Sequence, residues 1–152
     1  MKLSSLRFIL AAASSFVVMQ VAAYAQITGP IDADIPFAFT AGNTTFPSGR
    51  YVIKPLDDAD QALVQITSND GRHSAWLPVL PSVDATEPAG TELVFNKYGD
   101  SEFLSQIFEG GNKNGLEVRN SIPEQRLQKK GQHPVKHRHP AHSRGMKPAK
   151  RK

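Results

Sequence analysis

Four histidines stand close together near the C-terminal end of the sequence, in the stretch KKGQHPVKHRHPAHSRGMKPAKRK: His133, His137, His139 and His142. Neutral imidazole is a good ligand for zinc, nickel and copper. Pro134 and Pro140 disfavour a helix, so His133 and His137 would not share one helical face as an i, i+4 pair. We expect only weak metal binding at these histidines, and no bound cofactor or metal elsewhere.

Other residues that could do chemistry are scarce. Asp57, Asp58 and Asp60 make an acidic loop, but it lacks the 12-residue spacing, central glycine and terminal glutamate of a calcium hand. Asp70 and His73 flank a turn without a serine nucleophile arranged beside them. No phosphate loop, dinucleotide fingerprint or catalytic pair of glutamates is visible. The sequence therefore predicts that the protein is not an enzyme.

The same C-terminal stretch has no acidic residue and nine cations: Lys129, Lys130, Lys136, Arg138, Arg144, Lys147, Lys150, Arg151 and Lys152. Such a stretch can bind nucleic acid by releasing counterions, but it has no aromatic side chain to stack on a base. It can also bind an anionic lipid, an anionic polysaccharide or an acidic protein partner. A third alternative is a segment that folds back and screens an acidic body. We favour contact with an anionic surface.

The first 25 residues have the order of a secretory signal peptide. Lys2 and Arg7 precede an apolar stretch, and Ala23-Tyr24-Ala25 places small residues where the peptidase cuts before Gln26. The apolar stretch is shorter than the roughly 20 residues that a membrane span needs. We therefore expect an exported protein, periplasmic or extracellular, with no transmembrane span in the mature chain.

Charge divides the mature chain at about residue 127. All 14 acids and seven of the 18 bases lie in residues 26–127, which leaves that part at −7, whereas residues 128–152 carry +9. There is no cysteine, so disulfides and thiolate metal sites are excluded. The acidic part must be held together by apolar burial.

Residues 26–127 show the period-two alternation of β-strands. We expect about seven strands in an antiparallel sandwich or small barrel: one over 31–39, one over 50–56, a hairpin over 61–80, a second hairpin over 91–108 and a last short strand over 116–118. Asp70-Gly71 and Tyr98-Gly99-Asp100 supply the hairpin turns. Trp76 is expected in the core, with a ligand platform as the alternative.

A short helix is predicted over 122–128. Ser121 and Glu124 have the spacing of a capping box, and Pro123 suits the first helical turn. The chain beyond it is rich in Lys, Arg, His and Pro and lacks the apolar area needed to offset its ordering entropy. We therefore expect a disordered, basic, histidine-rich tail over 128–152.

Three motifs resemble a group of small exported, uncharacterised bacterial all-β proteins. They are an IPF-x-F opening, a P-x-G-x-Y turn, and the hairpin LVF-x-x-YGD-x-x-FLSQI, which together cover most of residues 31–127. The resemblance implies an exported all-β domain and brings no catalytic or binding residues with it.

These observations predict an exported, non-catalytic β domain that binds or scaffolds at the cell envelope, with its basic tail against anionic surfaces. One alternative is an assembly or adhesin-type subunit that pairs through an exposed edge strand. Another is an enzyme whose site is dispersed across several strands.

Overall fold

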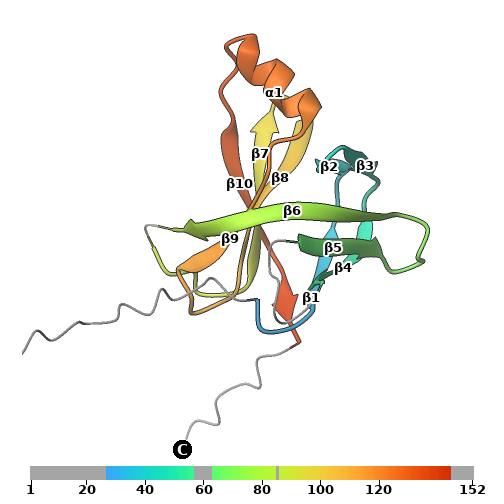
Figure 1. The fold of residues 1–152 in the computed structure, drawn as a ribbon, viewed down its shortest axis with the longest axis vertical. Coiled ribbons are helices and arrows are strands. Elements are labelled where there is room, and N and C mark those ends of the chain that lie inside the picture. The colour runs from blue at the N-terminus through green and yellow to red at the C-terminus, as the bar shows by residue number, and fades with distance from the viewer. Residues whose placement is uncertain (1–26, 57–62, 85, 145–152) are drawn as a thin grey trace, which may run out of the picture.

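The computed structural model describes residues 27–56, 63–84 and 86–144, which form one large mixed β-sheet and one short helix (Figure 1). The expected signal peptide and the acidic loop at Asp57, Asp58 and Asp60 lie outside the described residues. The elements are β1 Ile31–Ile35, β2 Phe39–Ala41, β3 Thr44–Phe46, β4 Gly49–Pro55, β5 Leu63–Ser68, β6 Ser74–Val83, β7 Glu92–Tyr98, β8 Ser101–Phe108, β9 Asn114–Val118, α1 Ile122–Lys129, β10 Val135–Pro140 and β11 His142–Ser143.

The strands follow the order β10-β7-β8-β9-β6-β5-β4-β1-β11. Neighbours in this order are antiparallel, as expected. The sheet is mixed because β2, which forms a small hairpin with β3, also pairs in parallel with β8 at Thr40 and Phe103. β6 is the longest strand and crosses the middle of the molecule, where it pairs with both β5 and β9 (Figure 1).

Both predicted hairpins are confirmed. β5 and β6 meet through a turn in which Gly71 has a φ of 72°, and the Ser68 hydroxyl donates to Asp70 at 2.6 Å. β7 and β8 meet through Gly99, with a φ of 58°. An L-residue with a side chain rarely adopts these angles, which is why each turn has a glycine at this position.

The expected strand over 31–39 is divided. β1 ends at Ile35, directly before Pro36, and β2 begins at Phe39. Proline cannot donate a hydrogen bond to a neighbouring strand, so the ladder stops there. The segment after β2, expected as a loop, contains β3. These short pieces and the C-terminal strands bring the described chain to eleven strands, against the seven expected.

The main core consists of inward-facing residues from both halves of the strand order. Its largest fully buried side chains include Tyr51, Phe39, Phe46, Phe95 and Ile53. The prediction that Trp76 belongs to this core is wrong, because its side chain is 49% exposed. On β6 the inward positions are taken by Leu77 and Val79, and Trp76 alternates with them toward solvent.

The predicted helix is confirmed as α1. The Ser121 hydroxyl accepts a hydrogen bond from the Glu124 amide at 3.2 Å, and Pro123 lies in the first turn. Glu124 is buried and accepts from Asn96 Nδ2 at 2.6 Å and from the Tyr98 hydroxyl at 3.2 Å. These bonds hold α1 against the ends of β7 and β8 (Figure 1).

The prediction of a disordered tail from residue 128 is wrong for the part that the structure describes. Residues 135–140 form β10 on β7, and residues 142–143 form β11 on β1. The prediction considered only the burial of apolar area as a source of stability for this stretch. Backbone hydrogen bonds with β7 and β1, and ion pairs with acidic side chains, stabilise it as well.

Candidate functional site

The stretch of residues 135–144, which we call the closing segment, contains three of the nine predicted contact residues: Lys136, Arg138 and Arg144. Its first part pairs with β7 from Val135 opposite Lys97 to Pro140 opposite Glu92. Its last part pairs with β1, with His142 opposite Asp32. Between them Ala141 is buried and donates its amide to the Thr91 carbonyl at 2.8 Å. One stretch of chain thus pairs with both outermost body strands of the order.

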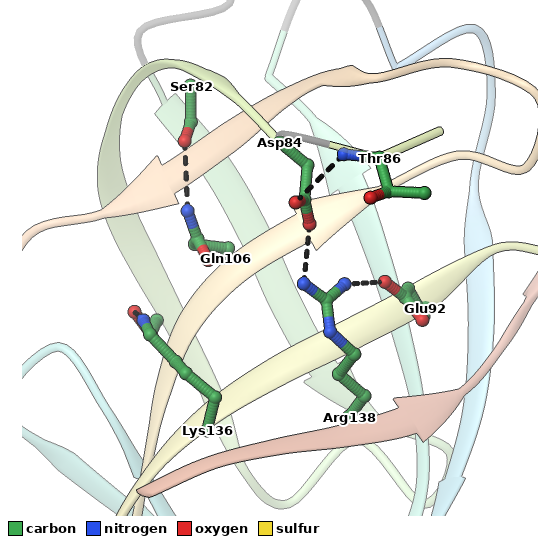
Figure 2. Close-up of polar contacts among 8 residues, drawn as sticks. Ser82, Asp84, Thr86, Glu92, Gln106, Lys136 and Arg138 are labelled. Atoms are coloured by element: carbon green, nitrogen blue, oxygen red, sulfur yellow. Dashed lines mark hydrogen bonds and ion pairs between the residues drawn. The ribbon is translucent and has the colours of Figure 1, made fainter. Parts of the chain in front are cut away.

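Arg138 joins the closing segment to two carboxylates of the rest of the chain. Its guanidinium Nη2 donates to Asp84 Oδ2 at 2.5 Å, and its Nη1 donates to Glu92 (Figure 2). The hydrogen bond that Arg138 donates to Asp84, followed by the one to Glu92, raises the pKa of Arg138 above its usual range. This forked geometry suits guanidinium, which can bind two carboxylates at once. Arg138 therefore binds acidic side chains of the protein itself.

Arg144 behaves in the same way at the other end of the segment. Its Nε and Nη2 each donate to the Asp32 carboxylate at 2.5 Å. Just before it, the Ser143 hydroxyl donates to Glu109 at 2.8 Å, and the same buried carboxylate accepts the Thr28 amide at 3.1 Å. Glu109 therefore joins the first described residues of the chain to its last strand.

Lys136 lies two positions before Arg138 on β10, and Figure 2 draws both side chains. Its ammonium donates to the Ser105 hydroxyl at 3.1 Å. Removal of the ammonium from water lowers the pKa of Lys136, while Glu117 and Glu124 oppose this shift. Lys136 is thus held against the sheet and does not project as a free cation.

The four histidines are not gathered into a metal site. His137 Nδ1 donates to Glu102 Oε1 at 3.0 Å, and His139 Nε2 donates to the Asp34 carbonyl at 2.7 Å. The rings of His137 and His139 both pack beside Phe37. His133 and His142 are exposed. Among the described residues no three His, Cys, Asp or Glu side chains converge as a metal cluster.

The other predicted cations divide into two sets. Lys129 and Lys130 lie exposed at the end of α1. Lys147, Lys150, Arg151 and Lys152 lie outside the described residues. Of the nine cations, Lys136, Arg138 and Arg144 are occupied within the chain, which reduces the charge that the closing segment can offer to an external anion.

A second surface was anticipated only through Trp76, for which a ligand platform was the alternative to a core position. The outward side of β6 carries Trp76, Pro78 and Leu80 at alternate positions, and all three are exposed. We call these three residues the β6 ridge. Neighbouring residues of a strand face opposite sides of the sheet, so Trp76 and Leu77 had to face opposite ways. Both sets of alternate residues along β6 are apolar, however, and the sequence pattern therefore did not show which set faces the core.

Polar side chains flank the β6 ridge on both sides. On β5, Gln65 lies opposite Trp76 and donates to Ser74 at 3.3 Å. On β9, Glu117 lies opposite Leu80. Glu117 and Leu80 line a shallow depression of about 350 Å³ together with Arg119, Asn120 and Gln125. A second depression of about 410 Å³ is lined by Val52, Lys54, Gln65, Thr67, Ser68 and Asn69. This face of the sheet is therefore polar on both sides of the apolar β6 ridge.

The described part of the chain includes no helix with the length and apolar character of a membrane span. Comparison with protein-family models, with curated proteins and with solved structures finds no match for this chain.

Proposed function

We propose that this chain is an exported, non-catalytic binding module of the cell envelope, and that its ligand is a polysaccharide held along the β6 ridge. The observation that carries the proposal is the half-exposed indole of Trp76 on the outer face of a sheet. A pyranose ring has an apolar C–H face, which packs on an aromatic ring, and a rim of hydroxyls, which seeks amides and charged groups.

The flanking residues suit such a ligand better than a lipid. Three polar side chains surround the β6 ridge and offer both donors and acceptors: Gln65 on β5, Ser74 on β6 itself and Glu117 on β9. The two depressions beside the β6 ridge carry both signs of charge, with Glu117 and Arg119 in one and Lys54 in the other, whereas an anionic membrane surface would favour a face of one sign. The depressions are shallow, which fits an extended chain lying across the strands.

We also propose that the expected small barrel is the correct description of the sheet. β10 and β11 are separated only by Ala141 and pair with β7 and β1, which stand at opposite ends of the body's strand order. A barrel formed in this way leaves fewer edges for unwanted pairing. It also makes the outer surface around β6 rigid enough to hold a ligand without rearrangement.

Trp76 is the only tryptophan, so its fluorescence reports directly on the proposed site. The chain should be titrated with soluble hexasaccharides of N-acetylglucosamine and glucose and with polygalacturonate. We expect a saturable change in emission with at least one of them. Calorimetry should then show at least tenfold weaker binding for Trp76→Ala and wild-type binding for Val135→Ala, which removes an exposed apolar side chain from another strand. Equal affinities for the two variants would exclude the β6 ridge.

A further inference from the structure

The closing segment is held mainly by backbone pairing and polar contacts. Ala141 is its one residue in the main core cluster, and Val135 is 69% exposed. Its side chains bind Glu92, Asp84 and Glu102, all of which belong to the body of the protein. The segment can therefore leave the sheet without dismantling the aromatic core beneath it.

A short connection joins the closing segment to the rest of the chain. α1 ends at Lys129, and β10 begins at Val135 after Gly131, which has a φ of 77°, and Pro134. The amides of Lys130, Gly131 and Gln132 are tied to the last turn of α1. Residues 133 and 134 are thus the place where the chain can straighten. Short hinges of this kind favour exchange of an element between copies.

Departure of the segment removes the backbone partners of β7 and of the start of β1. The two freed positions are selective for a basic strand, because Glu92 and Asp84 lie beside the first and Asp32 lies at the second. A strand that fits must present arginines at the positions of Arg138 and Arg144, with a small residue between them at Ala141. The closing segment of this chain meets these requirements.

We propose that two copies of this chain exchange their closing segments, so that β10 and β11 of each copy complete the sheet of the other. The contacts in the exchanged dimer are the same as in the monomer, and only the backbone at residues 133–134 changes direction. Exchange is therefore favoured by concentration and by refolding from a state in which the segment is free. This inference does not depend on the polysaccharide proposal.

The absence of cysteine permits a direct test with single-cysteine variants. Lys97 and Val135 lie opposite each other on β7 and β10. Opposed residues of antiparallel strands have Cα atoms about 4.5–5.5 Å apart, which suits a disulfide. Full-length Lys97→Cys and Val135→Cys chains, one of them isotopically labelled, should be unfolded together, refolded at high concentration and oxidised. A 97–135 disulfide between two chains forms efficiently only if the Val135→Cys chain has placed its strand on the other copy.

The matched control pairs Lys97→Cys with Arg126→Cys, because Arg126 is exposed on α1 and lies two positions from Glu124, the helix residue that is buried against β7, so that the two side chains leave the helix on different sides. We expect the 97–135 link to exceed the 97–126 link at least tenfold, and to increase with protein concentration during refolding. Equal yields of the two links at every concentration would show that only random collisions join the chains, and would overturn the proposal.

Discussion

Replacing Arg138 with alanine removes the two-pronged contact that holds β10 to the acidic body. The guanidinium lies 2.5 Å from Asp84 and also binds Glu92, and the two carboxylate side chains are only 15% and 18% exposed. An exposed ion pair contributes about 0.2–1 kcal/mol to stability. Because both carboxylates are largely buried and would face each other without this cation, we place each contact at the upper end of that range.

The expected loss is therefore about 1–2 kcal/mol in the free energy of unfolding. For a folded unit of roughly 100 residues, each kcal/mol lowers Tm by about 4 °C or somewhat more. Thermal unfolding followed by circular dichroism should thus place Arg138→Ala about 4–8 °C below the wild type at low salt. The difference should shrink in 1 M NaCl, where screening acts over about 3 Å.

Arg126→Ala is the matched control, because it removes the same charge from an exposed position on α1. We expect its Tm to lie within about 2 °C of the wild type, since surface changes of this kind are usually within about 0.5 kcal/mol. Arg138→Lys should be intermediate, because one ammonium cannot reproduce the fork. If Arg138→Ala and Arg126→Ala have the same Tm, the contacts of Arg138 do not hold β10 and the reasoning fails.

Three further outcomes are expected. Gly115→Ala should destabilise the fold by about 1–3 kcal/mol in urea denaturation, because its Cβ would lie 2.6 Å from the Ile107 carbonyl oxygen, whereas Gly90→Ala, which meets open space, should not. Burial raises the pKa of the Glu124 carboxyl, so the native state holds its proton longer than the unfolded chain and this group costs stability as pH rises above about 4.5. The Tm of Glu124→Gln minus that of the wild type should therefore increase between pH 4.5 and pH 7. A difference in Tm that does not change with pH would contradict this. A chain ending at Arg144 loses four cations and should be retained less on vesicles with anionic lipid than the full chain at 0.15 M salt; equal retention would remove those residues from any surface contact.

The hairpins and the helix could be predicted because their signals are local. Asp70-Gly71 marks a turn between alternating strands, and Ser121 with Glu124 marks a helix start. The closing segment had no such local signal. Arg138 meets Asp84 and Glu92 from 54 and 46 positions away, and Arg144 meets Asp32 from 112 positions away. Only the opposite net charges of the two parts hinted at this contact, and charge alone gives no register.

The candidate site was predicted in composition but not in placement. The cations at Lys136, Arg138 and Arg144 were identified, yet they bind the protein's own hydroxyls and carboxylates. Trp76 was placed on the wrong side of its strand, because Leu77 and Val79 make an equally apolar alternative phase. Which phase faces inward depends on the neighbouring strands β5 and β9, and these contacts are set by the tertiary fold.

Amide hydrogen exchange of the full chain tests most directly whether the basic C-terminal stretch is part of the sheet. The amides of residues 135–143 that bond to β7 and β1 should exchange many times more slowly than in the unfolded chain, and Ala141, which donates to Thr91, should be among the slowest of them. Exchange of this stretch at the rate of an unfolded peptide, with β7 and β8 protected, would contradict the account.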